Sequence, residues 1–291
     1  MYPLLLFSGS SFVGRHFRSA LRDDQLFWTF CQKPEAGGLP FDVRKHRLAD
    51  LPAAALKARH AIVLLGDTSL ERCAAQPEVT RETNVEGLIR LLHDLLEHQI
   101  FPVFFSTDNV FDGHQGNYRE VDPATPVIEY GRQKAAVEQF LSESGKPHLL
   151  LRLSKIYGLR PGDGTLITGL VDQIQKGEVV RSAADQIYSP IWAGDVVQVV
   201  LGLLEIGAQG IYHVGGPAAY SRSTTFDEVA AQLQKRGMGS GASQQLCSID
   251  DFGLRETRPK DTSLNTSKLW NQLPWQPLSL PQAVEKVLEQ I

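Results

Sequence analysis

Short apolar runs alternate with longer amphipathic stretches through the first half of this 291-residue chain, and no other feature constrains its fold more. Five of the runs are bounded by turn or polar residues: residues 4–7, 26–30, 61–65, 103–105 and 149–153. Residues 85–97 show the clearest helical period, with leucines on one face and charged side chains on the other. Fully apolar strands separated by helices are typical of a parallel sheet that is covered on both faces. The alternation therefore predicts a doubly wound α/β domain, whose ligands would lie beyond the carboxyl ends of the strands.

The character of the sequence changes after about residue 155. Residues 158–164 are rich in glycine and proline, and a capping box that begins at Thr225 predicts a helix start there. We expect the doubly wound domain to cover residues 1–157 and a smaller α+β region to cover residues 158–291. Segments near residues 186–206 are expected to return to the first domain.

The charge and the cysteine content exclude several classes of function. The chain has 29 Lys and Arg against 33 Asp and Glu, a net charge of −4, so it lacks the basic surface expected of a nucleic-acid-binding protein. Its three cysteines, Cys31, Cys73 and Cys247, have no spacing typical of a zinc site or a disulfide framework. The apolar N-terminal run is too short for a membrane segment. These features predict a cytoplasmic protein that binds no metal, no nucleic acid and no membrane.

Small residues follow the first predicted strand at residues 8–14, where a dinucleotide-binding turn would lie. A complete glycine fingerprint of the GxxGxxG type would place glycine at 8, 11 and 14, but Ser8 and Ser11 replace two of the three. Both substitutes are small, and the helix that follows would direct N–H groups at a pyrophosphate. The backbone expected to contact the cofactor belongs to Gly9, Ser10, Ser11, Phe12, Val13 and Gly14. A tight strand-to-helix turn without a ligand is the alternative interpretation.

The second predicted strand ends without the acidic residue that NAD-specific sites direct at the ribose 2′-hydroxyl. Arg15 and Lys33 are instead cations that could face a 2′-phosphate. This pattern favours NADP over NAD, unless Lys33 is only a solvated surface residue. Asp42 and Val43 lie where the adenine ring is expected, although an aspartate in a turn is also a common local cap.

Tyr130 and Lys134 stand four residues apart in a predicted helix, so their side chains share a face. A nearby ammonium favours the phenolate, and we expect it to lower the pKa of Tyr130 from its reference value near ~10. Such a tyrosine can protonate a carbonyl oxygen as hydride arrives at the carbon. Thr107 ends a predicted strand earlier in the chain, and its hydroxyl would bind the same oxygen. Each residue alone has an ordinary alternative, a pair on a helix surface or a strand-end cap.

Further motifs occur in one order along the whole chain. The most specific are Ser-Thr-Asp-Asn-Val-Phe-Asp-Gly at 106–113 and Tyr-Gly-Arg-Gln-Lys at 130–134. Others lie at residues 84–87, 120–126, 151–158, 185–190 and 258–266. With these motifs the chain resembles the extended short-chain dehydrogenases/reductases, and among them the dTDP-4-dehydrorhamnose reductase branch of sugar-nucleotide reductases. The resemblance implies a Rossmann-type doubly wound sheet that binds NADP, followed by a smaller α+β substrate region.

The resemblance also implies roles for individual residues. Tyr130 would be the general acid, Lys134 would bind the nicotinamide ribose and tune Tyr130, and Thr107 would hold the substrate carbonyl. Further cofactor contacts would come from Asp42, Val43, Leu65, Gly66 and Ser154. Contacts to the sugar nucleotide would come from Asp108, Asn109, Lys155, Gln186 and Arg258. Asn109 and Lys155 stand where the family has tyrosine and tryptophan, so the identity of the sugar is left open.

The sequence therefore predicts an NADPH-dependent reductase of a 4-keto, 6-deoxy sugar nucleotide, with hydride from the nicotinamide and a proton from Tyr130. Two alternatives stay open. One is a non-catalytic, NADP-binding regulatory subunit that resembles the beta subunit of methionine adenosyltransferase, and the incomplete glycine loop suggests it. The other is a sugar-nucleotide epimerase that keeps its cofactor bound. A homodimer is the default expectation for assembly.

Overall fold

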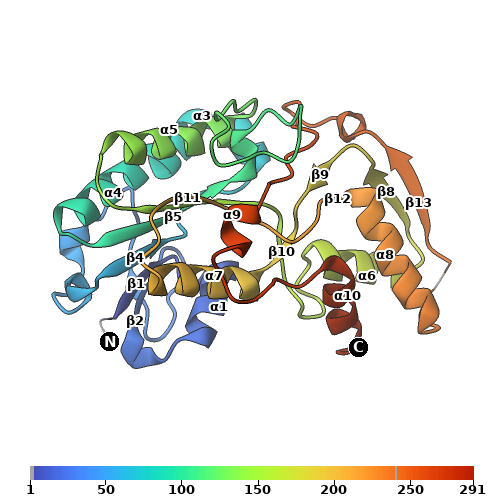
Figure 1. The fold of residues 1–291 in the computed structure, drawn as a ribbon, viewed down its shortest axis with the longest axis horizontal. Coiled ribbons are helices and arrows are strands. Elements are labelled where there is room, and N and C mark those ends of the chain that lie inside the picture. Colours follow the sequence, from blue (N-terminus) through green and yellow to red (C-terminus); the bar gives the residue numbers. More distant parts are fainter. Residues whose placement is uncertain (1–2, 240) are drawn as a thin grey trace. The chain divides into compact units, whose positions relative to one another are not determined.

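The computed structural model of the chain describes residues 3–239 and 241–291, and it divides into two compact units (Figure 1). Unit 1 consists of Met1–Val110, Pro126–Arg152 and Leu203–Tyr212. Unit 2 consists of Phe111–Thr125, Leu153–Gly202 and His213–Ile291. The domain boundary expected at residue 157 stays a prediction.

A seven-stranded sheet with the strand order β11-β6-β5-β4-β1-β2-β3 forms the centre of unit 1. Its strands are β1 (Leu4–Phe7), β2 (Leu26–Phe30), β3 (Leu39–Pro40), β4 (His60–Val63), β5 (Phe101–Thr107), β6 (Leu149–Leu153) and β11 (Gly210–Val214). The pairings from β5 through β4, β1 and β2 to β3 are parallel. The five apolar runs thus correspond to β1, β2, β4, β5 and β6, which confirms the predicted Rossmann-type fold class. The two outer strands, β3 and β11, escaped the sequence analysis because edge strands carry a weaker apolar pattern.

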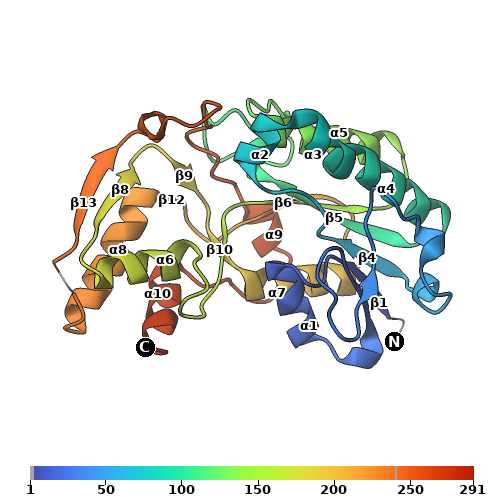
Figure 2. The same cartoon turned by 180° about the vertical axis from the view of Figure 1, so that it is seen from behind.

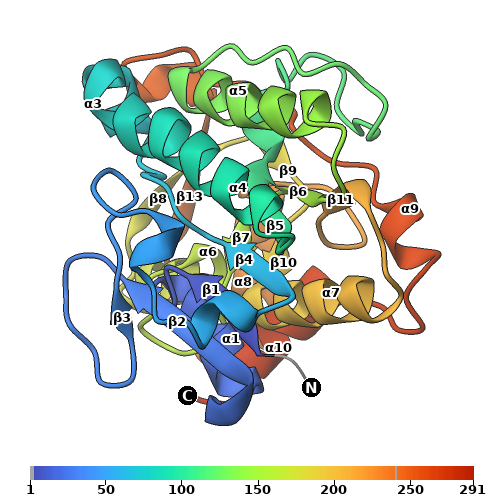
Figure 3. The same ribbon diagram turned by 90° about the vertical axis from the view of Figure 1, so that its left-hand side faces the viewer.

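Helices cover both faces of this sheet, as a doubly wound fold requires (Figure 3). One face carries α3 (Pro77–Arg81), α4 (Leu88–Glu97) and α5 (Glu129–Glu143), and the other carries α1 (Phe12–Ala20). The short α2 (Leu70–Ala75) precedes α3, and a wider π-helical turn, η4 (Glu82–Gly87), joins α3 to α4. Short 3₁₀ turns lie at η1 (Asp23–Gln25), η2 (Leu48–Asp50), η3 (Ala55–Lys57) and η5 (Asp108–Val110).

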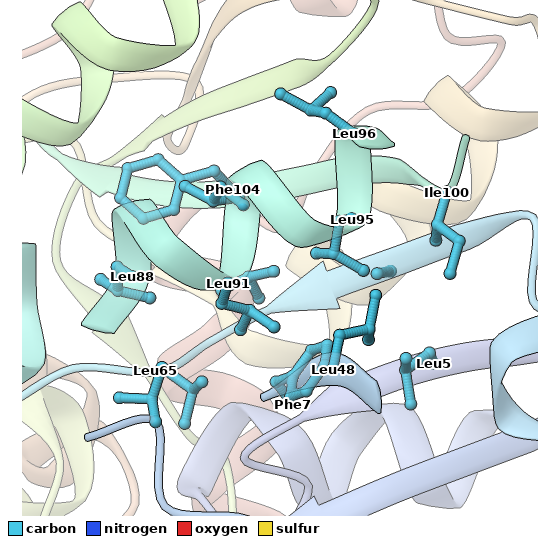
Figure 4. Packing of buried hydrophobic residues seen from close by; sticks show 14 of the residues in the cluster. Leu5, Phe7, Leu48, Leu65, Leu88, Leu91, Leu95, Leu96, Ile100 and Phe104 are labelled. Atoms are coloured by element: carbon cyan, nitrogen blue, oxygen red, sulfur yellow. The ribbon is translucent and has the colours of Figure 1, made fainter. Parts of the chain in front are cut away.

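The predicted amphipathic segment at residues 85–97 supplies much of the core of unit 1. Leu88, Leu91 and Leu95 of α4 are buried and lie beside Phe104 of β5 and Phe7 of β1 in one cluster (Figure 4). Burying one such leucine fully contributes about 1.5–3 kcal/mol. This packing fixes α4 on the sheet, and it holds the ends of β1 and β5 at one edge.

In unit 2, helices pack against short strands (Figure 2). Its helices are α6 (Leu166–Gln175), most of α7 (Ala193–Glu205), α8 (Arg222–Lys235), α9 (Ser267–Trp270) and α10 (Leu280–Leu288). The strand pairs are β7 (Ile156–Tyr157) with β10 (Ile191–Trp192), β8 (Val179–Ala183) with β13 (Ser243–Cys247), and β9 (Ile187–Tyr188) with β12 (Tyr220–Ser221). A 3₁₀ turn, η6, covers Ile249–Phe252. Apolar faces of α6, α8 and α10 form its core.

The predicted helix start at Thr225 was wrong by one turn. Helix α8 begins at Arg222, because the hydroxyl of Ser221 accepts the N–H of Thr224 and caps the helix there. Thr225 is buried inside the helix, and its own hydroxyl donates to the carbonyl of Ser221 at 2.8 Å. A serine four residues upstream thus provides the cap that the sequence pattern placed at the threonine.

Candidate active site

The turn after β1 holds a serine in the left-handed conformation. Ser8 has φ = 67°, and its N–H donates to the hydroxyl of Thr29 on β2 at 3.0 Å. The N–H of Gly9 donates to the carbonyl of the same threonine at 2.8 Å. A non-glycine residue costs about 1–2 kcal/mol in this conformation. The bonds to Thr29 therefore hold a serine in the geometry for which a glycine fingerprint would supply glycine.

Close packing explains the two glycines that the turn does contain. A Cβ at Gly9 would lie 2.8 Å from Cβ of Trp28, and a Cβ at Gly14 would lie 2.4 Å from the carbonyl oxygen of Ser8. Both separations are far too short for real side chains, so the turn and the first turn of α1 can approach each other only with glycine here. Trp28 fills the space beside the turn, so only glycine fits at position 9, whereas the fingerprint places its first glycine at position 8.

The amino end of α1 presents unused donors. Ser11 caps the helix by accepting the N–H of Gly14 at 3.1 Å. The backbone N–H groups of Phe12 and Val13 have no acceptor among residues 3–239 and 241–291. Arg15 donates to the carbonyl of Ser10 at 2.7 Å, which places a cation against the turn. Free N–H groups at a helix start and a nearby guanidinium form a suitable cradle for a pyrophosphate.

Cations pair with the carboxylates that follow β2 and β3, and Arg18 binds Glu35 at 2.6 Å. Arg44 binds both carboxylate oxygens of Asp42, at 3.0 and 2.7 Å, and this pair lowers the pKa of Asp42 to about 2. Lys33 is exposed to solvent. Burial raises the pKa of the Cys31 thiol, and the positive charges of Arg44 and Lys45 oppose that rise. Arg44 was missed by the sequence analysis, although its spacing two residues after Asp42 could have indicated the pair.

The residues expected beside the adenine and along the cofactor lie at the same edge of the sheet. Val43 is buried, and its carbonyl accepts a bond from Arg90 of α4 at 2.7 Å. Leu65 is buried after β4, and Gly66 has φ = 149°, a conformation that only glycine adopts readily. A Cβ on Gly66 would lie 3.6 Å from Nζ of Lys134. The turn after β4 therefore lies directly against the lysine of the proposed proton-transfer group.

Asn84 holds this turn in place, and the sequence analysis gave it no role of its own. Its side chain accepts the N–H of Asp67 at 2.6 Å and donates to the carbonyl of Asp67 at 2.9 Å. The same amide donates to Oε1 of Gln133 on α5 at 2.8 Å. Asn84 is fully buried in the π-helical turn between α3 and α4. One amide thus links the turn after β4 to the helix of Tyr130 and Lys134.

Helix α5, which carries Tyr130 and Lys134, packs against the end of β5, the strand that ends at Thr107. Lys134 is buried, its Nζ donates to the carbonyl of Phe105 at 2.8 Å, and it lies 6.0 Å from the ring centre of Tyr130. A Cβ at Gly131 would lie 2.1 Å from the carbonyl oxygen of Asn109. Glycine at this position therefore lets the first turn of α5 press against the turn that follows Thr107.

The predicted lowering of the Tyr130 pKa was wrong. Burial raises the pKa of the Tyr130 phenol, and the negative charge of nearby Asp108 adds to the rise. Burial also lowers the pKa of Lys134 to about 8, against the opposing influence of Glu138 and Cys73. The expectation considered only the ammonium beside the phenol, whereas removal from water disfavours the charged form of both groups. Tyr130 is consequently a protonated donor at neutral pH.

Two neighbours hold the hydroxyl of Thr107. It donates to Oδ1 of Asp108 at 3.2 Å, and it accepts the backbone N–H and the side-chain amide of Asn109 at 3.2 and 3.1 Å. Asn109 also donates to Oδ1 of Asp108 at 2.8 Å. Asp108 and Asn109, which the resemblance placed at the sugar, therefore also fix the orientation of the Thr107 hydroxyl.

The remaining predicted residues belong to unit 2, where backbone bonds connect their segments. The N–H of Ser189 donates to the hydroxyl of Ser154 at 2.9 Å, and the carbonyl of Lys155 accepts the N–H of Ile191 at 2.9 Å. The N–H of Ile187 donates to the carbonyl of Lys260 at 2.7 Å. The segments of Ser154 and Lys155, of Gln186, and of Arg258 are thus neighbours within this unit. Arg258 is buried and lines a cavity of about 250 Å³ with Asp250 and Glu256.

No helix in the described part of the chain combines the length and the hydropathy that a membrane span needs. Within residues 3–239 and 241–291, no three His, Cys, Asp or Glu side chains form a group that could hold a metal ion.

Comparison with known proteins agrees with the resemblance. Residues 4–291 match the family model described as RmlD substrate binding domain. A probable low-salt glycan biosynthesis reductase, Agl14 of Haloferax volcanii, is 29% identical over 211 residues, which are 71% of this chain and 69% of that protein. The dTDP-4-dehydrorhamnose reductase of Aggregatibacter actinomycetemcomitans is 25% identical over 231 residues, 76% of this chain and 77% of its own. The structure of a dTDP-4-dehydrorhamnose reductase from Bacillus anthracis in complex with NADP superimposes with a TM-score of 0.81 at 19% identity, covering 100% of this chain and 99% of that one.

Proposed function

Because the chain belongs to the RmlD substrate binding domain family and is an oxidoreductase, we propose that it uses NADPH to reduce the 4-keto group of a 6-deoxy sugar nucleotide. One observation carries the proposal: Lys134 of α5 binds the carbonyl of Phe105, two residues before Thr107, and lies 6.0 Å from the ring centre of Tyr130. Their elements also lie at the edge of the sheet that presents the cradle after β1. Reductases among the relatives support the reaction class.

The residues of unit 1 fit a dinucleotide. Gly9 and Gly14 let the turn and the start of α1 pack closely, and the N–H groups of Phe12 and Val13 lie at the start of α1, where a pyrophosphate could accept them. A Cβ on Gly66 would lie 3.2 Å from Oδ1 of Asn84 and 3.6 Å from Nζ of Lys134, so glycine lets the backbone lie beside this lysine. A bound nicotinamide would supply the hydride, and the lysine would hold the adjoining ribose.

The protein's own part in the reaction is proton transfer and charge stabilisation. Tyr130 carries its proton at neutral pH because burial raises its pKa, so it donates that proton to the keto oxygen. Thr107 lies at the carboxyl end of β5, and its hydroxyl donates to the same oxygen as negative charge develops. Without substrate this hydroxyl donates to Oδ1 of Asp108, so it would turn from Asp108 to the keto oxygen while Asn109 still donates to its oxygen.

A preference for NADP over NAD is the finer part of the proposal. Among the described residues, the carboxylates that follow β2 and β3 are paired with cations, Glu35 with Arg18 and Asp42 with Arg44. Lys33 is exposed at the end of that strand, and Arg15 lies at the turn after β1. Positive charge at this edge favours a 2′-phosphate over a 2′-hydroxyl.

The decisive experiment follows NADPH oxidation by the purified chain with a panel of nucleoside-diphosphate 4-keto-6-deoxy sugars. Turnover with at least one of them, faster with NADPH than with NADH, is the expected result. Dinucleotide binding without turnover, together with stoichiometric co-purification of a larger enzyme, would instead support the regulatory subunit. Tightly retained NAD and interconversion of sugar epimers would support the epimerase.

A further inference from the structure

A buried ion pair lies one helical turn beyond Lys134, and the reaction as described does not use it. Arg152 of β6 donates to the carboxylate of Glu138 through Nε, at 3.2 and 3.1 Å, and through Nη2, at 2.8 Å. Relative exposure is 7% for Glu138 and 4% for Arg152. A buried pair of this kind gives little net stability over apolar residues of similar size. Its presence beside the proposed site therefore calls for a role other than stability.

The pair is connected to the end of β5 by side chains of α5. Tyr130, Lys134 and Glu138 recur every four residues and so share one face of the helix. Lys134 binds the carbonyl of Phe105, and the hydroxyl of Ser106 donates to Oε1 of Glu138. Phe105 and Ser106, the two residues immediately before Thr107, are thus each hydrogen-bonded to a side chain of α5.

From this geometry we infer that Glu138 is a positioning residue, which with Arg152 holds the Lys134 ammonium and the end of β5 in the arrangement that the proposed reduction requires. The inference rests on the proposed function for its purpose, but the contacts that carry it lie wholly within unit 1. Glu138 acts through Lys134 and Ser106, and it touches neither substrate nor cofactor.

The charge of Glu138 also affects the pKa of Lys134. The groups that face Lys134 are Glu138 and Tyr130 on its own helix, Cys73 of α2, and the carbonyl of Phe105 on β5. Burial lowers the pKa of Lys134 to about 8, and the carboxylate of Glu138 is the larger of the two charges that oppose this fall. Arg152 contacts Glu138 from β6, while Asp108 and Asp67 act on Tyr130. Without the Glu138 charge, the ammonium would lose its proton at a lower pH.

The test measures the titration of Lys134 directly. Protein labelled with ¹³C at lysine Cε gives one NMR signal for Lys134, assigned by its loss in Lys134→Arg. In Glu138→Gln we expect the midpoint of that titration to fall by about one pH unit. Glu138→Asp keeps the carboxylate, so its midpoint should stay close to that of the wild type. Glu143→Gln, an exposed change on the same helix, should leave the midpoint unmoved. NADPH binding should weaken as the pH rises through the titration midpoint of Lys134, and the pH at which it weakens should shift together with that midpoint in each variant.

A second variant tests the same inference without leaving an unpaired buried charge that could unfold the protein. Glu138→Gln leaves Arg152 buried without its carboxylate, whereas Glu138→Gln combined with Arg152→Met replaces the whole pair, a change that buried pairs tolerate better. A downward shift is expected in this double variant too, smaller than in Glu138→Gln because the positive charge of Arg152 is also removed. An unmoved midpoint in the folded double variant would overturn the inference. Because the titration needs neither dinucleotide nor sugar, a shifted midpoint in a protein that reduces no keto sugar would support the role of Glu138 and reject only the proposed reaction.

Discussion

The turn after β1 and the junction of β5 with α5 are both parts of the proposed site, but they depend on the sequence in different ways. The turn works through backbone N–H groups, and it tolerates a serine at φ = 67° because Thr29 binds that serine and the following glycine. The junction works through the phenol, ammonium and hydroxyl of Tyr130, Lys134 and Thr107. Backbone chemistry permits changes of residue type wherever conformation and space are preserved, whereas side-chain chemistry does not. The incomplete glycine fingerprint is therefore compatible with a working site.

Replacing the proton donor should give the largest effect and test the junction directly. In Tyr130→Phe the ring still packs against Cys73 and Ile128, but the proton is lost, so kcat should fall about 10²- to 10⁴-fold. Steady-state NADPH oxidation measures the loss, and fluorescence titration should show unchanged NADPH binding. The control is Tyr157→Phe, whose buried hydroxyl has no hydrogen-bond partner within the described residues. Full activity in Tyr130→Phe would show that the junction does not depend on the phenol, and the proposed difference between the two regions would be wrong.

Crowding the junction should cost stability where crowding another helix does not. In Gly131→Ala the new methyl would meet the carbonyl of Asn109 at 2.1 Å, so the free energy of unfolding should fall by about 1–3 kcal/mol. The matched control is Gly169→Ala in α6, where the nearest atom lies 3.7 Å away and alanine should gain up to about 1 kcal/mol as the better helix former. Urea unfolding compares the two. Equal effects would show that α5 and the turn after Thr107 are not pressed together.

The charge of Lys134 should give function and stability opposite dependences on pH. Its pKa is lowered to about 8 in the folded protein, against about 10.4 in an unfolded chain. Between these values the unfolded chain binds the extra proton, so the contribution of Lys134 to the free energy of unfolding rises with pH by at most about 1.4 kcal/mol per pH unit. NADPH binding should fall across the same range as the ammonium is lost. Parallel urea and binding titrations of the wild type and Lys134→Met isolate both trends, and trends of equal sign would contradict this assignment.

Restoring the fingerprint glycine should have the smallest effect and should sharpen the contrast. Ser8→Gly removes the cost of a left-handed serine, so the free energy of unfolding should rise by about 1 kcal/mol. Ser10→Gly, at a position without positive φ, should bring no such gain. NADPH affinity should change little in Ser8→Gly, because its backbone conformation is already the required one. A large gain in affinity would show that the serine does impair the turn.

The sequence predicted the strand and the helix that carry Thr107, Tyr130 and Lys134, because the relevant signals are local. The spacing of Tyr130 and Lys134 places them on one helix face in any α-helix, and the position of Thr107 after an apolar run places it at a strand end. Asn84, Arg44 and Glu138 were missed, because each acts through a partner that is identified only in three dimensions. The pKa of Tyr130 was predicted in the wrong direction for the same reason, since burial is a property of the packed structure.

By itself, the sequence determined five strands of the central sheet and the shared helix face of Tyr130 and Lys134, because apolar periodicity and residue spacing act over short range. Only the tertiary structure decided that Trp28 moves the glycine requirement to position 9 and that Gly131 admits the turn after Thr107. It also decided that the Lys134 ammonium lies within reach of a buried carboxylate. Contact distances and removal from water depend on which surfaces meet, and a linear pattern does not contain that information.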